Sequence, residues 1–384
     1  MQRLPGLDLL RAIAIVWVML FHSFLVGGFA PGWDWLSYWG WMGVDLFFVL
    51  SGFLIGSQVL RPLGEGRTLD FRDFYVRRIF RVLPAYFVVL GLYFLVPDFR
   101  EEPGIQPLWQ FLTFSLNFLI DYAHNRAFSH AWSLCVEEHF YLVFPLAAAL
   151  LARRMSLRGF VGLCIGLVAV GIAIRGYVWL YDMAPVSGVA TAARSFSQRY
   201  VEDMYYPTYN RLDGLLAGVI LAAIKVYRPA WWERVQQHAN ALLIVGLLMM
   251  AGVLWLFVDR VGFIPNLIGF PLLSAALALL VAAGAGTRSW IGRWRVPGAG
   301  WIAAISYSLY LSHKGVMHLV SLSFGAELEA HGFFAFCSYA AAALVGGALL
   351  HWMVERPCLR WRERWLRTTP KWKAAENALP EASA

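Results

Sequence analysis

The chain has 384 residues, of which 59% are apolar and only 15% are charged, and its formal net charge is +8. Soluble domains carry about 25% charged residues, whereas here the charged residues are confined to short intervals between long apolar runs. The composition therefore excludes an ordinary water-soluble protein and predicts one that crosses a membrane many times.

Ten apolar runs are long enough to cross a membrane, because a hydrocarbon layer of ~30 Å needs about 20 helical residues. They fall near residues 9–29, 40–60, 76–97, 134–152, 159–181, 208–224, 239–258, 263–284, 299–321 and 333–354. The first run follows a basic start but is too long for the core of a cleaved signal peptide, so we expect it to be a span. The predicted fold class is all-α, a polytopic transmembrane helical bundle of about ten spans.

Segment 107–122 is also apolar, but it is too short to count as a further span. Counting it would reverse the side of every later loop and remove the charge bias described next. We therefore expect an interfacial or re-entrant helix in an outer loop, and the sequence does not choose between these two.

Lys and Arg residues alternate between rich and poor connecting segments, as the positive-inside rule requires. The rich set contains 22 of them and the intervening set contains 5. The rich segments are 1–8, 61–78, 153–158, 225–238, 285–298 and 355–384. This bias predicts that both termini are cytoplasmic, and it accounts for the positive net charge without a nucleic-acid partner.

Ionisable side chains inside spans are costly and usually face a cavity or a partner, so they mark candidate functional sites. With both termini inside, such residues from five spans fall in the outer half of the membrane: His22, Asp45, Glu137, Glu138, His139, Arg211, Asp213, His313 and Lys314. For any one of them, the alternative is a buried polar group that only holds neighbouring helices together. The four Cys residues lack zinc-ligand spacing, so the sequence predicts no metal site.

A second polar group lies at the cytoplasmic edge. Arg77, Arg78 and Arg81 continue into a span at helical spacing, where guanidinium groups can bind phosphates, although an ordinary positive flank has the same pattern. Arg11 and His22 share a face of the first span and are ~16.5 Å apart at 1.5 Å per residue. A basic inner mouth below His and carboxylate groups suggests group transfer across the membrane.

Seven short motifs follow one another along the chain. They are Leu7 to Ala12 (LDLLRA), whose Arg11 is separated from His22 by ten residues, Gly43 to Phe53 (GVDLFFVLSGF), Arg77 to Tyr86 (RRIFRVLPAY), Trp132 to Tyr141 (WSLCVEEHFY), Arg211 to Gly218 (RLDGLLAG), Ser306 to His313 (SYSLYLSH) and Glu355 to Pro357 (ERP). In this order they resemble the acyltransferase-3 family of integral membrane acyltransferases over nearly the whole chain. His139 and Lys314 depart from the family pattern, so we expect unusual acceptor contacts there.

The resemblance implies an enzyme that takes an acyl group, often acetyl, from cytoplasmic acyl-coenzyme A. The acceptor would be a hydroxyl of a carbohydrate or a lipid-linked glycan at the extracytoplasmic side of a bacterial inner membrane. Acyl-coenzyme A would be a substrate, and no permanently bound cofactor is implied. Residues 1–357 would form the transmembrane domain and 358–384 a basic cytoplasmic tail, as in stand-alone members without an esterase-like domain.

The residues and the resemblance together suggest roles within the candidate site. His22 is expected to be the leading catalytic residue, either a general base for the acceptor hydroxyl or a nucleophile that accepts the acyl group. Glu137 is expected to orient His22 or the acceptor, and His313 is the second imidazole. The phosphates of coenzyme A are assigned to Arg11, Arg77, Arg78 and Arg81. The acceptor contacts are assigned to Asp45, Glu138, Arg211, Asp213 and Lys314.

Two other classes of function are compatible with parts of this pattern. A proton-coupled transporter or exporter also uses intramembrane His, Asp and Glu, although the chain lacks matching broken-helix segments in two halves. A receptor or assembly scaffold would tolerate replacement of His22. The acyltransferase hypothesis predicts that it would not.

Overall fold

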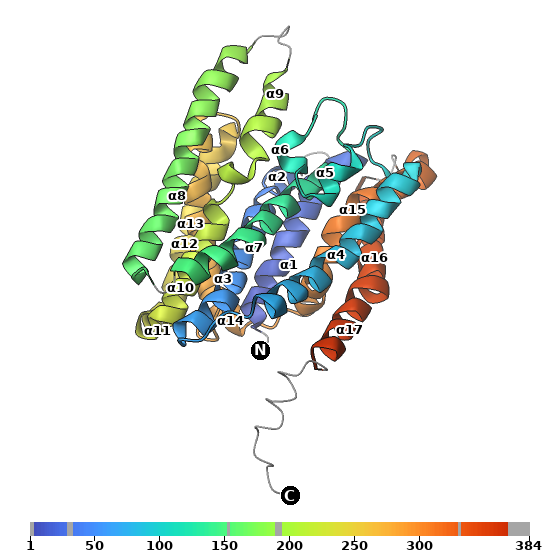
Figure 1. Cartoon of the computed structure of the whole chain (residues 1–384). Helices are drawn as coiled ribbons and strands as arrows, with labels where there is room; N and C mark the ends of the chain where they lie inside the picture. Colours follow the sequence, from blue (N-terminus) through green and yellow to red (C-terminus); the bar gives the residue numbers. More distant parts are fainter. Residues whose placement is uncertain (1–3, 29–33, 152–153, 189–193, 329–331, 368–384) are drawn as a thin grey trace, which may run out of the picture.

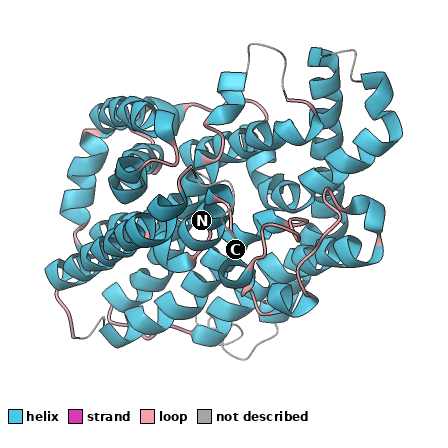
Figure 2. Ribbon diagram, turned by 90° about the horizontal axis from the view of Figure 1, so that it is seen from above, coloured by secondary structure: helices cyan, strands magenta, loops and turns pink. Residues whose placement is uncertain are grey.

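The computed structural model describes residues 4–28, 34–151, 154–188, 194–328 and 332–367. Within them, the regular structure is helical apart from an isolated β-bridge between Ile105 and Ala127. Figure 2 shows this part of the chain as helices joined by loops, without a strand. The predicted all-α fold class is confirmed. The expected tail lies mostly outside the described residues, which end with helix α17 (Arg356–Arg367).

One long helix lies at each of the predicted runs. These helices are α1 (Pro5–His22), α3 (Met42–Gly64), α4 (Phe71–Leu95), α7 (Trp132–Leu151), α8 (Leu157–Val178), α10 (Asp213–Tyr227), α12 (Ala239–Leu256), α13 (Phe270–Gly284), α15 (Ala299–Leu328) and α16 (Gly332–Leu350). Eight of these positions carry a helix apolar and long enough to span a membrane. The chain is therefore a multi-pass membrane protein.

The two remaining helices, α10 and α15, differ from the other eight for separate reasons. α10 has 15 residues and continues, after a bend of 113°, as α11 (Pro229–Gln237). α15 is a continuous helix of 30 residues, but its sequence is less apolar because it contains buried polar residues such as Ser308, Ser312 and Lys314. Polar side chains therefore concentrate on one of the longest helices of the bundle.

The segments between the long helices divide onto two sides of the bundle (Figure 1). The lower side in Figure 1 carries α11, α14 (Trp290–Arg293) and α17, all in segments rich in Lys and Arg. The upper side carries α2 (Asp34–Tyr38), α5 (Leu108–Leu112), α6 (Leu116–Leu119) and α9 (Phe196–Arg199). This division matches the alternation of charge in the sequence, and we call the lower side inner and the upper side outer.

Segment 107–122 contains two short helices, α5 and α6, where a single helix was expected. Phe114 between them has a φ of 54°, a left-handed conformation that a bulky residue rarely adopts and that interrupts a helix. Both helices are too short to cross a bilayer. The prediction that this segment is not a span is therefore confirmed, and the prediction of one continuous helix was wrong.

Close packing of α3 on α10 brings two of the sequence motifs together. A methyl group on Gly52 of α3 would overlap the carbonyl oxygen of Leu215, and one on Gly218 of α10 would overlap that of Val49. Glycine is required at both positions because the two helix backbones meet there. α1 packs against both α3 and α15, and this places the outer end of α1 beside the polar residues of α15.

Candidate active site

Two buried imidazoles meet near the outer end of α1. His22 is the last residue of α1, where the helix tightens into a 3₁₀ turn (Ser23–Val26), and His313 lies within α15. Nδ1 of His22 is 3.0 Å from Nε2 of His313, and the two residues are 9% and 0% exposed. The structure thus brings together two of the three residues expected to be catalytic, although they are 291 positions apart in the chain.

The hydrogen bonds of His313 determine which nitrogen of His22 is free. Nδ1 of His313 is 2.8 Å from the carbonyl oxygen of Tyr310, and because a carbonyl can only accept, this nitrogen carries a hydrogen. In the neutral ring, Nε2 of His313 then has the lone pair and accepts a hydrogen bond from Nδ1–H of His22. The other nitrogen of His22, Nε2, therefore keeps a lone pair and can act as a base or a nucleophile.

A third imidazole and a buried ion pair complete this group, which we call the histidine cluster: His22, His130, His313, Lys314 and Glu101. The ring centroid of His130 lies 5.0 Å from that of His313 and 6.1 Å from that of His22. Nζ of Lys314 lies 3.5 Å from Oε1 of Glu101, and both side chains are almost fully buried. Among the described residues, no group of three or more His, Cys, Asp and Glu side chains could hold a metal ion.

His130 and Glu101 were not among the residues expected from the sequence. His130 lies in the 3₁₀ turn η3 (Ser129–Ala131), directly before α7 and outside the predicted span. Its position two residues before the motif that starts at Trp132 was the available signal. Glu101 belongs to an outer loop, and its carboxylate accepts the N–H of Phe128 at 3.2 Å. No local sequence pattern marks Glu101, because its burial depends on contacts with distant segments.

Glu137 belongs to a separate group, the carboxylate cluster: Glu137, Glu138, Ser51, Tyr141 and Arg78. Oε1 of Glu137 accepts a hydrogen bond from the Ser51 hydroxyl at 2.8 Å, and Oε2 accepts one from the Tyr141 hydroxyl at 2.9 Å. Arg78 interacts electrostatically with Glu138, and its guanidinium carbon lies 5.8 Å from the ring centroid of Tyr141. Glu137 was expected to orient His22 or the acceptor. His313, and not Glu137, makes the hydrogen bond to Nδ1 of His22, so the role toward the acceptor is the one that stays a prediction for Glu137.

Besides Lys314, three more of the residues assigned to the acceptor are held in buried ion pairs. Nη2 of Arg211, just before α10, donates to Oδ1 of Asp45 on α3 at 2.8 Å. Arg175 on α8 donates to both carboxylate oxygens of Asp213 on α10, at 2.8 and 3.1 Å. The Arg211 guanidinium also lies over two aromatic rings, 4.2 and 4.5 Å from their centroids. These two ion pairs connect α3, α8 and α10, and each charge faces an opposite charge within the protein.

The arginines at the inner end of α4 differ in their partners. Nε of Arg77 donates to Oδ2 of Asp73 one turn earlier, at 2.8 Å. Arg81 forms an ion pair with Glu355, a buried residue of the π-helical turn η11 (His351–Glu355). Nε of Arg78 is buried and has no hydrogen-bond partner among the described residues. Of these three guanidinium groups, that of Arg78 belongs to the carboxylate cluster and has an N–H group without a hydrogen-bond acceptor among the described residues.

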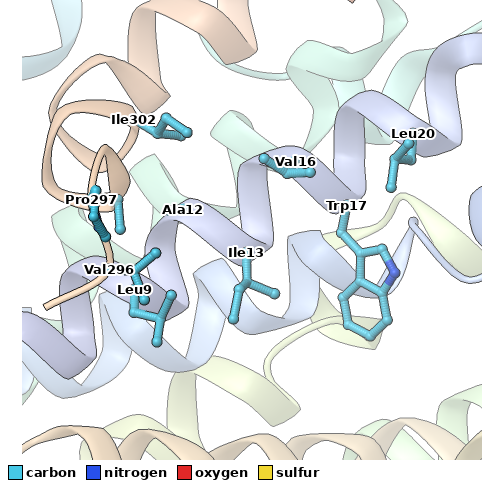
Figure 3. Close-up of a pocket in the computed structure, with 10 residues that line it drawn as sticks. Leu9, Ala12, Ile13, Val16, Trp17, Leu20, Val296, Pro297 and Ile302 are labelled. Carbon is cyan, nitrogen blue, oxygen red and sulfur yellow. The ribbon is translucent and has the colours of Figure 1, made fainter. Parts of the chain in front are cut away.

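One face of α1 borders an apolar groove of about 280 Å³. Figure 3 shows Ile13, Val16 and Trp17 of α1 on one wall and Pro297 and Ile302 on the other. The lining residues are aliphatic or aromatic, so the groove offers no group for acid, base or nucleophilic chemistry.

Arg11, the fourth residue assigned to the donor, lies in the inner half of α1. Its Nη1 atom is 3.4 Å from Oδ1 of Asp8, and the two side chains are 28% and 18% exposed. The pair is thus more open to the surroundings than Arg175 with Asp213, whose side chains are 1% and 6% exposed.

The fold and the site together define a class of protein. The chain is a multi-pass membrane protein whose interior holds paired imidazoles with one free ring nitrogen and a separate group of carboxylates. Both membrane-embedded transfer enzymes and ion-coupled transporters have such interiors.

Comparison with known families distinguishes these two possibilities. A family model described as an acyltransferase domain matches residues 4–352. Because the match covers most of the chain, the protein belongs to the acyltransferase-3 family.

Two bacterial proteins illustrate its relatives. "O-acetyltransferase OatA" of Staphylococcus aureus is 28% identical over 337 residues, which cover 83% of this chain and 51% of that protein. "Putative peptidoglycan O-acetyltransferase YrhL" of Bacillus subtilis is 30% identical over 340 residues, which cover 82% of this chain and 49% of that protein. The chain thus spans about half the length of the curated relatives it matches. No solved structure matches it significantly.

Proposed function

We propose that the protein transfers an acetyl group from acetyl-coenzyme A to a hydroxyl of a cell-envelope carbohydrate. Membership of the family supports acyl transfer. The names of both relatives refer to O-acetyl transfer, and one of them refers to peptidoglycan. The identity of the donor, the identity of the acceptor and the side of the membrane are proposed here for this chain, which spans about half the length of those relatives.

The observation that carries the proposal is the hydrogen bond between His22 and His313. As the acceptor oxygen attacks the thioester carbonyl, Nε2 of His22 takes the hydroxyl proton, and the carbon–sulfur bond then breaks to release coenzyme A thiolate. The imidazolium returns its proton to that thiolate. His313 keeps the ring of His22 in one orientation throughout, through the bond to Nδ1. A covalent route, in which Nε2 attacks the thioester first, uses the same free nitrogen.

The donor is proposed to bind with its phosphates at the inner arginines and its thioester near His22. Arg78 and Arg81 interact electrostatically with Glu137, and Glu137 does so with Tyr310. The Tyr310 ring in turn lies 6.0 Å from that of His313 between centroids. Polar side chains from the inner arginines to the histidine cluster are thus close enough to interact electrostatically. A pantetheine arm extended along them would carry the acyl group across most of the membrane, so no separate flipping step is required.

The orientation rests on the 22 to 5 division of Lys and Arg between the two sides. We propose that the inner side is cytoplasmic, which matches a cytoplasmic donor and an acceptor in the cell envelope. Single Cys reporters placed in segments 182–188 and 225–238 test this orientation. A reagent that cannot cross the membrane should label the first from outside and spare the second, and the reverse pattern would contradict the orientation.

The test of the function uses the purified full chain in proteoliposomes. Acetyl-coenzyme A is supplied on one side and peptidoglycan saccharides released by a muramidase on the other. Release of the coenzyme A thiol and acetylation of the saccharides, read by mass spectrometry, should depend on both reactants. His22→Ala should abolish saccharide acetylation. The matched control is His318→Ala, which removes a half-buried imidazole from α15 and should retain activity.

Three outcomes of this test bear on the chemistry. An acetylated His22 peptide recovered after incubation with donor alone would select the covalent route. Movement of the saccharide across the membrane without acetylation would support a transporter and contradict the proposal. Saccharide acetylation by the His22→Ala protein within about tenfold of the parent rate, a barrier change of only ~1.4 kcal/mol, would exclude His22 from the reaction.

A further inference from the structure

We infer that His130 binds the acceptor: its Nδ1 atom accepts a hydrogen bond from a second hydroxyl of the carbohydrate, beside the hydroxyl that is acylated. This inference rests on the proposed function and adds a binding residue to the same site. His130 is 2% exposed, and its ring packs edge-on against that of His313 with centroids 5.0 Å apart. It therefore lies next to the imidazole that orients His22.

The hydrogen bond of the His130 ring indicates which of its nitrogens is free. Nε2 lies 3.4 Å from the carbonyl oxygen of Leu311, and because that oxygen can only accept, Nε2 carries the hydrogen. In the neutral ring, Nδ1 then holds a lone pair. Nδ1 is buried and has no hydrogen-bond partner among the described residues. A buried acceptor without a donor is unfavourable, which points to a donor that arrives with a ligand.

The backbone around His130 is held in place from two directions. The Tyr310 hydroxyl donates to the carbonyl oxygen of His130 at 2.8 Å and lies 2.6 Å from the hydroxyl oxygen of Ser133. Two residues earlier, Phe128 has a φ of 56°, and its N–H donates to Glu101 at 3.2 Å. Strained backbone of this kind persists only where the surroundings enforce it. The free nitrogen of His130 therefore has a defined position.

The chemistry of the cluster favours a hydroxyl as the missing donor. Lys314 is a donor within the cluster, but its ammonium group lies against Glu101 at 3.5 Å and makes no hydrogen bond to Nδ1 of His130. The hydroxyl that is acylated gives its single proton to Nε2 of His22, so it cannot also donate to His130. A second hydroxyl on the same sugar can donate to Nδ1 of His130 while the first one reacts. The site would thus prefer an acceptor with several hydroxyl groups.

The experiment compares two substitutions that preserve different nitrogens of the ring. In His130→Gln, the glutamine amide can place an N–H near the position of Nε2 and keep the hydrogen bond to the carbonyl oxygen of Leu311. It offers no hydrogen-bond acceptor near the position of Nδ1. Asparagine in His130→Asn places its amide oxygen near the position of Nδ1. The KM values for peptidoglycan saccharides and for acetyl-coenzyme A are measured for both variants and the parent. His318→Gln on α15 is the matched control.

We expect His130→Gln to raise the KM for the saccharides about tenfold, as for the loss of one hydrogen bond. The KM for acetyl-coenzyme A should not change, and His130→Asn should restore most of the saccharide KM. If the KM for acetyl-coenzyme A rises and the KM for the saccharides does not, the pantetheine arm of the donor lies against Nδ1 of His130. That result would overturn the inference. An equal fall in kcat in both variants, with no change in the KM for the saccharides, would also overturn the inference. His130 would then only hold His313 in position.

Failure of the proposed function gives a different result from failure of this inference. If the parent protein transfers no acetyl group to the saccharides, the proposed function fails. Saccharide affinity is then measured directly by saturation-transfer NMR on the same proteins. Equal affinity of the parent and His130→Gln overturns the assignment of His130, and an affinity reduced about tenfold and restored by His130→Asn supports it.

Discussion

Two of the groups of buried polar residues in this bundle, the ion pairs around α10 and the histidine cluster, differ in which of their members have a partner inside the protein. Asp45 with Arg211, and Asp213 with Arg175, place a carboxylate against a guanidinium, so each charge has its counterpart inside the protein. In the histidine cluster, the hydrogen bonds of the rings leave one nitrogen free on His22 and another on His130. Ionisable groups buried in this bundle therefore serve two purposes: opposite charges that join helices, and imidazoles whose second nitrogen can take part in chemistry.

The largest effect is expected on the stability of the protein when one of the buried ion pairs is broken. Arg175→Ala would leave the Asp213 carboxylate buried without its partner, and removing one member of a buried pair costs about 3–5 kcal/mol. We expect a much lower thermal unfolding midpoint in detergent. Arg158→Ala, at an exposed position of the same helix, should unfold like the parent. If Arg175→Ala has normal stability but no longer acetylates the acceptor, the pair of Arg175 and Asp213 serves the reaction and not the stability of the fold.

The next effect concerns the orientation of His22. His313→Ala would remove the acceptor of the hydrogen bond from Nδ1–H of His22. We expect kcat to fall by ~150-fold, which corresponds to about 3 kcal/mol for a hydrogen bond to a group that becomes charged. His313→Gln can place an amide oxygen near the lost Nε2 and should recover part of the rate. A His313→Ala protein that keeps kcat within threefold of the parent would show that His22 needs no partner.

A smaller effect is expected at the inner end of α4. Arg78→Ala should weaken the binding of acetyl-coenzyme A by about 2 kcal/mol, or ~30-fold in Kd, if its charged hydrogen bonds to phosphate are lost. Arg77→Ala should have less effect, because Arg77 already donates to Asp73. Calorimetry on the protein in nanodiscs measures both Kd values. An unchanged Kd for Arg78→Ala, with assembly intact, would place the donor phosphates elsewhere.

The smallest effect is expected at His139, which departs from the family pattern. Its Nδ1 atom lies 2.8 Å from Oγ1 of Thr208, and its ring stacks on that of Phe118. Glutamine can make the same hydrogen bond, so His139→Gln should change stability by less than about 1 kcal/mol and leave the acceptor KM within twofold. An acceptor KM that rises with unchanged stability would instead add His139 to the acceptor contacts, as the sequence pattern suggested.

Much of the fold and part of the site could be predicted from the sequence, because they depend on properties that are local along the chain. Apolar runs of span length require helices in a bilayer, where every backbone polar group needs a partner within its own segment. The distribution of Lys and Arg then assigns each run a direction, and the direction gives the depth of every residue in it. His22 and His313 could therefore be placed in one layer of the membrane from their positions in two spans.

Tertiary structure alone decided which residues within that layer touch. Depth does not specify the rotation of a helix or its neighbours, so Glu137 and His313 were equally able to face His22 until packing of α1 on α15 brought His313 to it. Side chains such as Arg211 could equally have bound a substrate, and only the neighbouring Asp45 shows the pairing. His130 and Glu101 come from segments outside the predicted spans, and they enter the cluster through contacts with α15. Contacts between residues distant in sequence depend on how whole helices pack, and no local pattern encodes that.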